Sequence, residues 1–170
     1  MQETVEQYKQ RIMGYLGDQN PLRVQSKTAG QIERLVKRVP TGKLRKRPAP
    51  GKWSVAEILA HLADSEIVVG YRMRSILGAP GTPIAAFDQD KWAEAENYAQ
   101  RDPKMSLRVL FTLREANLAL LKSLRAEQWR HFGIHSERGE ESIERIAQMM
   151  AGHDINHLRQ IEVILAVKKK

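Results

Sequence analysis

Two histidines one helical turn apart are the residues of this sequence best suited to chemistry. His153 and His157 are four positions apart, so on a helix both imidazoles leave the same face. Burying an imidazole without a partner costs free energy, and one cation can satisfy two rings. The pair therefore predicts a metal site, with ordinary hydrogen-bonded core histidines as the alternative. The other residues of that face are apolar: Ile143, Ile146, Met150, Ile161 and Ile164.

A third histidine, His61, lies in the run Trp53–Leu62 on a different predicted helix. Taken alone, it indicates a hydrogen-bonded core residue more readily than a ligand. Two familiar metal motifs are excluded. A zincin needs glutamate directly after its first histidine as general base, and Asp154 follows His153 instead. Di-iron bundles need a glutamate three residues before a histidine, and none of these three histidines has one.

The elements that must position these histidines are helices. Apolar residues recur with a period near 3.6 through most of the chain, and no stretch alternates for long with strand period. Ser54, followed by Glu57 three residues later, is a capping box that marks the start of the best-defined helix. After a short amphipathic stretch over 1–16, we expect four long helices over 21–39, 54–78, 103–124 and 142–167.

A long connection separates the second and third of these long helices. Gly78–Pro83 holds prolines and glycines that cannot continue a helix, and the irregular stretch reaches about Arg101. We interpret it as a crossover that lets two consecutive helices run parallel, anchored by packing of Trp92 and Tyr98. The prediction is an all-α fold, a four-helix bundle formed as one domain by residues 1–170. Residues 130–140 are predicted to form a loop.

Two polar residues interrupt the apolar seam of the third long helix. Arg114 and Asn117 lie between Leu110 and Leu121 at heptad-like spacing. They are either buried polar residues that fix the register of the helices, or pocket residues whose guanidinium holds an anionic substrate. The pattern does not choose between these two roles.

Composition indicates a globular protein without disulfides. The chain has 170 residues, 42% of them hydrophobic, and no cysteine, which excludes thiolate metal sites and a cysteine nucleophile. The first residues are polar and acidic, unlike a secretory signal. No apolar run approaches the roughly 18 residues that suggest a membrane span. We therefore expect a cytoplasmic protein with no membrane partner.

The net charge of +8 is concentrated in one segment. Residues 37–52 contain seven basic residues and no acidic one. Such a segment could contact phosphates, but its prolines and glycines indicate a solvated loop, and it has no series of aromatic residues on which bases could stack. Nucleic-acid binding is therefore the least favoured function.

Longer motifs resemble the DinB-like superfamily, and within it the YfiT-type proteins. The resemblance extends in order over nearly the whole chain, so it is specific. The residues that carry it are the segments Arg47–Gly51, Lys52–Glu66, Phe87–Trp92, His135–Glu140 and His153–Ile161.

This resemblance implies a four-helix bundle in which one histidine of the second long helix and two of the last bind a divalent metal. The ligands carry over to His61, His153 and His157. Zinc, nickel and ferrous iron all accept such a donor set. Members of the family are often homodimers, and many are named metal-dependent hydrolases. Characterised relatives include transferases and isomerases that use a low-molecular-weight thiol as cosubstrate.

Three neutral nitrogens leave coordination positions open, as a catalytic site requires. We therefore expect a metal-dependent enzyme acting on a small molecule, either a hydrolase or a low-molecular-weight-thiol S-transferase. The alternative is a non-catalytic, metal-stabilised stress or ligand-binding bundle.

Neighbouring polar side chains are candidates to orient the imidazoles. On adjacent turns of the ligand helices, these candidates are Glu57, Asp64, Asp154 and Gln160. His131 and His135 lie in the predicted loop, and we expect both at the surface.

Overall fold

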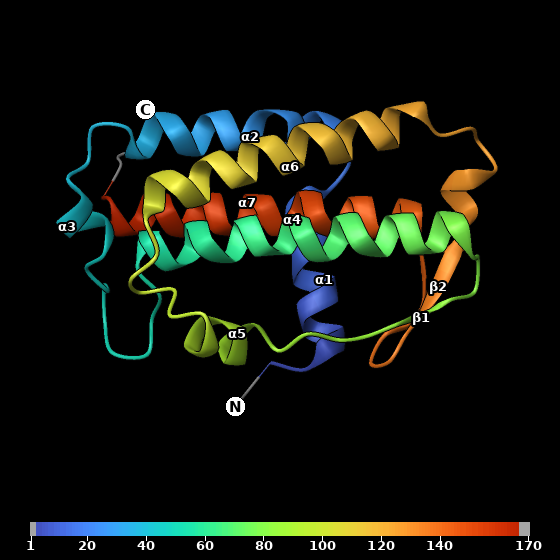
Figure 1. Cartoon of the computed structure of the whole chain (residues 1–170), viewed down its shortest axis with the longest axis horizontal. Helices are drawn as coiled ribbons and strands as arrows, with labels where there is room; N and C mark the ends of the chain where they lie inside the picture. The colour runs from blue at the N-terminus through green and yellow to red at the C-terminus, as the bar shows by residue number, and fades with distance from the viewer. Residues whose placement is uncertain (1–2, 167–170) are drawn as a thin grey trace.

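The computed structural model describes residues 3–166. α4 packs mainly against α6 and α2 mainly against α7, and contacts of α2 with α6 and of α4 with α7 close the ring. The N-terminal helix α1 (Val5–Leu16) packs on α7 and runs across the bundle rather than along it (Figure 1). The predicted four-helix bundle is thereby confirmed. Its members are α2 (Pro21–Val36), α4 (Val55–Gly78), α6 (Pro103–Ser123) and α7 (Ile143–Ile164).

The helix starts follow the capping signals of the sequence. Ser54 and Glu57 form the expected capping box: the Ser54 backbone N–H donates to Glu57 Oε2 at 2.8 Å, and the Glu57 N–H donates to Ser54 Oγ at 3.3 Å. The end of α2 was predicted three residues too late. Val39 precedes Pro40, and the residue before a proline is sterically disfavoured from helical geometry. The last helix was also predicted to end too late: it ends at Ile164, and Ala166 has a positive φ of 55° that a helix does not allow. The predicted last residue, 167, lies outside the described residues.

The crossover between α4 and α6 has the predicted role. It contains the two-residue strand β1 (Pro83–Ile84) and the short helix α5 (Gln89–Ala95), and it returns the chain so that α4 and α6 run parallel (Figure 1). Tyr98 is fully buried, and its hydroxyl donates to Asp64 Oδ2 at 2.5 Å. Trp92 packs on Phe87 with ring centroids 5.2 Å apart. The Tyr98 bond to α4 therefore holds the crossover against the bundle, whereas Trp92 packs within the crossover itself.

A small sheet replaces the loop expected over residues 130–140. After the 3₁₀ turn η1 (Gln128–Arg130), strands β2 (Phe132–His135) and β3 (Gly139–Ser142) pair antiparallel, and β1 of the crossover pairs parallel with β2. The prediction of a loop was wrong because strands this short carry little periodicity. Their pairing also depends on β1, a segment distant in the sequence.

The basic segment 37–52 takes part in the fold. It contains the short helix α3 (Thr41–Leu44), whose Leu44 is buried. Arg45 donates to the carbonyl oxygen of Gln100 at 3.1 Å, and Arg47 forms an ion pair with Glu57. Part of the positive charge of this segment is therefore used in contacts within the chain.

The core is divided into two apolar clusters with a polar layer between them. One cluster gathers around Leu59 and Leu62 of α4, and the other around Met73 and Ile76 farther along the same helix. Between the two, α4 carries Asp64, Ser65 and Glu66, all of them buried. Within residues 3–166, no helix combines the length and the apolar character that crossing a bilayer requires.

Arg114 is the centre of this polar layer. Its guanidinium donates to Glu66 Oε1 at 2.9 Å, to Asp154 at 2.5 and 2.9 Å, and to the carbonyl oxygen of Gln25 at 2.9 Å. Asn117 donates to Glu66 Oε2 at 3.0 Å. Burial alone would lower the pKa of Arg114, but the two carboxylates hold it above its ordinary value. The open choice for Arg114 and Asn117 is thereby decided: both are buried polar residues whose hydrogen bonds are satisfied within the bundle. Arg114 joins α6 to α4 and α7, and Asn117 joins α6 to α4.

Replacing Arg114 with methionine leaves the Glu66 and Asp154 carboxylates buried without their cation. We expect Arg114→Met to lower the free energy of unfolding by about 3–5 kcal/mol. Urea denaturation measures this loss. The matched control is Arg108→Met at an exposed position of the same helix, for which we expect a change within about 0.5 kcal/mol. Equal effects of the two substitutions would contradict the assigned role.

Candidate metal centre

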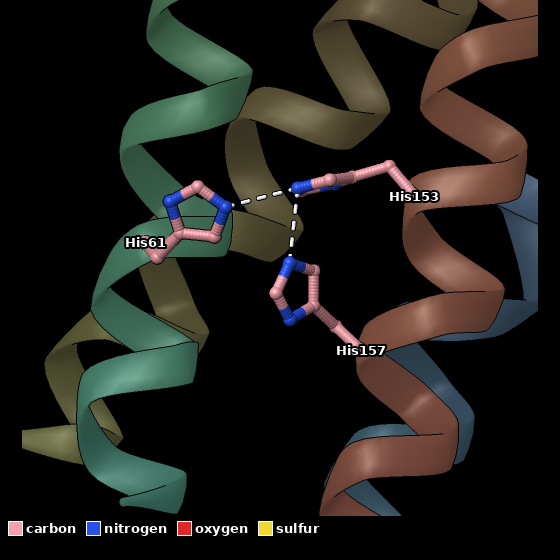
Figure 2. A group of neighbouring side chains, drawn as sticks. All are labelled: His61, His153 and His157. Atoms are coloured by element: carbon pink, nitrogen blue, oxygen red, sulfur yellow. Dashed lines mark hydrogen bonds between the residues drawn. The ribbon is translucent and has the colours of Figure 1, made fainter. Parts of the chain in front are cut away.

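Three imidazoles from two helices converge inside the bundle. His61 of α4 and the pair His153 and His157 of α7 point their Nε2 atoms toward one another (Figure 2). His153 Nε2 lies 2.9 Å from His61 Nε2 and 3.0 Å from His157 Nε2. All three side chains are buried, with 1%, 9% and 7% of their surface exposed. The structure therefore brings together the three histidines that the sequence singled out.

Hydrogen bonds alone do not account for this cluster. A ring nitrogen carries either one hydrogen or one lone pair, so His153 Nε2 can make one good hydrogen bond although it has two nitrogen neighbours. One cation at the centre could accept a lone pair from each ring. Two nitrogens bound to the same zinc ion at ~2.1 Å stand roughly 3.0–3.4 Å apart, close to the separations found here. The donor set therefore fits a divalent metal.

Burial keeps the three rings neutral, which is the form that binds metal. It lowers the pKa of His61 and His153 well below the ordinary 6.5, and neighbouring histidines lower both further. Burial also lowers the pKa of His157 to about 4, although the hydrogen bond that its ring makes to Gln160 Oε1 acts in the opposite direction. At neutral pH each Nε2 can therefore present a lone pair without first losing a proton.

Gln160 is the one orienting candidate that contacts an imidazole. Its Oε1 lies 2.9 Å from His157 Nδ1, so it favours the tautomer with hydrogen on Nδ1 and a free lone pair on Nε2. The Nδ1 atoms of His61 and His153 are buried and contact no acceptor among residues 3–166. Trp53 packs against the His61 ring, with centroids 5.0 Å apart. Packing against Trp53, rather than a hydrogen bond at Nδ1, therefore orients the His61 ring.

The other three orienting candidates have structural partners instead. Glu57 caps α4 and pairs with Arg47, and Asp64 accepts from Tyr98 and from Arg101 at 2.8 Å. The third, Asp154, is bound by Arg114, as described above. Each of these carboxylates fixes an element near the centre and does not touch a ring.

His131 and His135 stay outside the cluster, as expected, but His135 is not at the surface. It is 2% exposed in β2, where its Nδ1 accepts from the Glu137 backbone N–H at 3.1 Å. The expectation failed because this segment forms the small sheet, which covers the ring. His131 is half-buried where η1 meets β2.

Two cavities border the histidine centre. The larger has a volume of about 620 Å³ and includes His157 in its lining, and the smaller has about 280 Å³ and includes His61 and His153. Tyr8 and Gln89 line both. A volume of several hundred Å³ is typical of sites for small organic ligands. The centre is therefore reached from two sides.

Helix α1 supplies part of the wall of these cavities, a role that its amphipathic pattern did not reveal. Tyr8, Arg11 and Tyr15 all line the larger cavity. α1 approaches α7 closely at Gly152, where an added Cβ would lie 2.2 Å from the carbonyl oxygen of Ile12. The residue directly before His153 therefore has to be glycine for α1 to dock. In the sequence, a glycine within a predicted helix was the signal for this contact.

Comparisons with known proteins place the chain in a family whose members are named for metal-dependent chemistry. Residues 26–161, well over half of the chain, match the profile of the DinB superfamily. A protein of Oceanobacillus iheyensis, provisionally named a metal-dependent hydrolase, is 28% identical over 123 residues, 72% of this chain and 70% of that protein. YfiT of Bacillus subtilis has the same provisional name and is 28% identical over 112 residues, 65% of this chain and 63% of that one. The chain thus spans somewhat less than two thirds of YfiT in that alignment.

Two solved structures share the fold. The structure of Bacillus subtilis YfiT, described as a four-helix bundle of unusual topology, matches with a TM-score of 0.77 at 22% identity, over 97% of this chain and 91% of that one. A mycothiol-dependent maleylpyruvate isomerase matches with a TM-score of 0.63 at 13% identity, over 85% of this chain and 59% of that one. At these identities the likeness concerns the fold alone.

The depressed pKa values make the stability of the metal-free protein depend on pH. Between the ordinary histidine pKa of 6.5 and the value of about 4 for His157, the unfolded chain binds more protons than the folded one. The contribution of the neutral histidines to the free energy of unfolding is therefore fully present above pH ~6.5. It is lost as the pH falls toward ~4, and His157 alone accounts for about 3 kcal/mol of this loss. Urea unfolding with a chelator present measures this. His157→Gln should show a shallower pH dependence, and an unchanged one would contradict the argument.

The Gly152 contact predicts a large effect from a single methyl group. We expect Gly152→Ala to force α1 away from α7, to cost about 1–3 kcal/mol of stability and to speed hydrogen exchange in α1. The matched control is Gly14→Ala on α1 itself, where an added Cβ meets nothing within 4 Å. That substitution should be neutral or slightly stabilising. Normal α1 protection in Gly152→Ala would show that the contact does not place the helix.

Proposed function

The chain belongs to the DinB superfamily, and from this premise we propose that it is a metal-dependent enzyme whose His61, His153 and His157 bind one divalent metal ion. The observation that supports the proposal most is the convergence of three neutral Nε2 atoms beside two cavities. Its relatives are provisionally named metal-dependent hydrolases. A purely structural site would be closed by protein ligands, whereas three imidazoles leave positions for water and substrate.

When bound, the metal supplies Lewis acidity, which lowers the pKa of a coordinated water or thiol and polarises an electrophile. The residues of the chain do the rest. Gln160 favours one tautomer of His157, and Trp53 packs against the ring of His61. Tyr8 of α1 and Gln89 of the crossover line both cavities beside the centre. Zinc, nickel and ferrous iron all suit three imidazoles.

Two reactions fit this site. In one, the enzyme hydrolyses a small-molecule ester or amide. In the other, it transfers a low-molecular-weight thiol to an electrophilic small molecule, and the fold it shares with a mycothiol-dependent isomerase is compatible with that use. The proposal includes a single domain, a homodimer and a cytoplasmic location. Light scattering on the purified protein would test the dimer.

The ligand assignment predicts what loss of one histidine does. Wild-type protein should retain about one divalent ion per chain, and His157→Ala should retain less than about a tenth of that, because one of three ligands is lost. Turnover on panels of esters, amides and electrophiles, each with and without added thiols, should fall at least about 100-fold in the same variant. Elemental analysis and steady-state rates measure the two effects.

His131→Ala is the matched control, since His131 lies outside the cluster, and it should keep both metal and rate. Turnover that requires added thiol would identify the transferase, and turnover without it the hydrolase. Retained metal with no turnover on any panel would favour the alternative, a metal-stabilised ligand-binding bundle. Full metal content in His157→Ala would refute the ligand set.

A further inference from the structure

We propose that the larger cavity binds the anionic group of a small organic substrate, a carboxylate or a phosphate attached to an apolar or aromatic body. This inference rests on the proposed function, because it places that substrate beside the metal centre. His157 and Gln160 line the cavity, so a molecule bound there lies against the imidazole cluster.

The charges of the cavity lining favour an anion. Three cationic side chains, Arg11, Lys52 and Arg159, stand against one acidic residue, Asp90. Lys52 and Arg159 form no ion pair with any residue in the described part of the chain. These two cations are therefore available to a ligand, and a guanidinium can bind a carboxylate or phosphate with two parallel hydrogen bonds.

Arg11 has a different role in the same wall. It is held by Glu3 through two hydrogen bonds of 2.8 Å, and it donates to Asn156 Oδ1 at 2.9 Å. Glu3 already balances its charge. Arg11 therefore fixes α1 to α7 and positions Asn156, which itself lines the cavity as a neutral polar residue.

Aromatic rings form the remainder of the wall. Arg159 lies over the ring of Tyr15 at 4.4 Å, which holds its guanidinium at the cavity edge. Tyr8 and Trp53 complete a set of three rings around a volume of about 620 Å³. Rings of this kind pack against apolar or aromatic groups. The ligand class is therefore an organic anion with such a body, rather than a bare inorganic ion.

The smaller cavity lacks this excess of positive charge. Its two arginines, Arg72 and Arg138, are matched by Glu137 and Glu141. Arg138 is bonded to Glu141 at 2.5 and 2.8 Å, and Arg72 donates to the carbonyl oxygen of Ala85 at 2.7 Å. Since the two cationic and the two acidic side chains of this lining balance, the two cavities differ in net charge. An anionic substrate is oriented with its charged end in the larger cavity and its reactive group toward the histidines.

The experiment compares three probes of similar size: phenylacetate, phenylphosphate and the uncharged phenylacetamide. Binding is measured by calorimetry on chelator-treated protein and on metal-loaded protein, because an anion could otherwise bind through the metal itself. We expect at least one of the two anions to bind at least about tenfold more tightly than the amide in both forms. Arg159→Gln and Lys52→Gln should each weaken anion binding by about three- to tenfold and leave amide binding unchanged. Both residues are exposed, so both variants should fold normally.

Arg23→Gln is the matched control, since Arg23 is exposed on α2 and lines neither cavity; it should bind all probes as the wild type does. A preference for phenylphosphate or for phenylacetate identifies the anionic group. Equal affinity for all three probes, no saturable binding, or an equal loss in Arg23→Gln overturns the inference.

Metal content measured on the same samples separates this inference from the proposed function. Full metal loading without anion preference leaves the metal-dependent enzyme in place and removes the anion site. Anion preference in a protein that binds no metal keeps the anion site and removes the metal-dependent enzyme.

Discussion

The rotation of α7 about its own axis is the constraint on which the site depends. Successive residues of a helix point about 100° apart, so three in a row face three directions around it. Gly152 faces α1, where no side chain fits; His153 faces His61 on α4; and Asp154 faces Arg114 on α6. A small rotation of α7 would disturb all three contacts at once. The position of His153 is therefore set by its two neighbours as much as by the ring itself.

The buried ion network behind the histidines serves this placement. An ion pair in a protein interior contributes little net stability, because removing charges from water costs about as much as their attraction returns. Arg114 with Glu66 and Asp154 therefore contributes chiefly a fixed arrangement of α4, α6 and α7. We infer that this layer restricts the register in which the three helices pack. Fixed imidazole positions are what a metal with defined coordination geometry requires.

Those features of the fold and of the histidine site that depend on residues close together in the chain could be predicted from the sequence. The capping box at Ser54, the crossover after Gly78 and the histidine pair of α7 all depend on residues within a turn or two of each other. The determinants that were missed depend on distant pairing. The sheet needs β1 to meet β2, and the burial of His135 follows from that pairing. The role of α1 as a cavity wall also depends on how it crosses α7, which no periodicity encodes.

Burial of the three histidines has a cost to stability that only their function explains. An imidazole inside a bundle loses its hydration, and the Nδ1 atoms of His61 and His153 regain no acceptor within the described part of the chain. Leucine at these positions would pack the same space without that penalty. The burial that destabilises the rings also lowers their pKa values and keeps their lone pairs free. Such a cluster between two cavities is what the proposed metal site requires, and it is formed at a cost to the stability of the core.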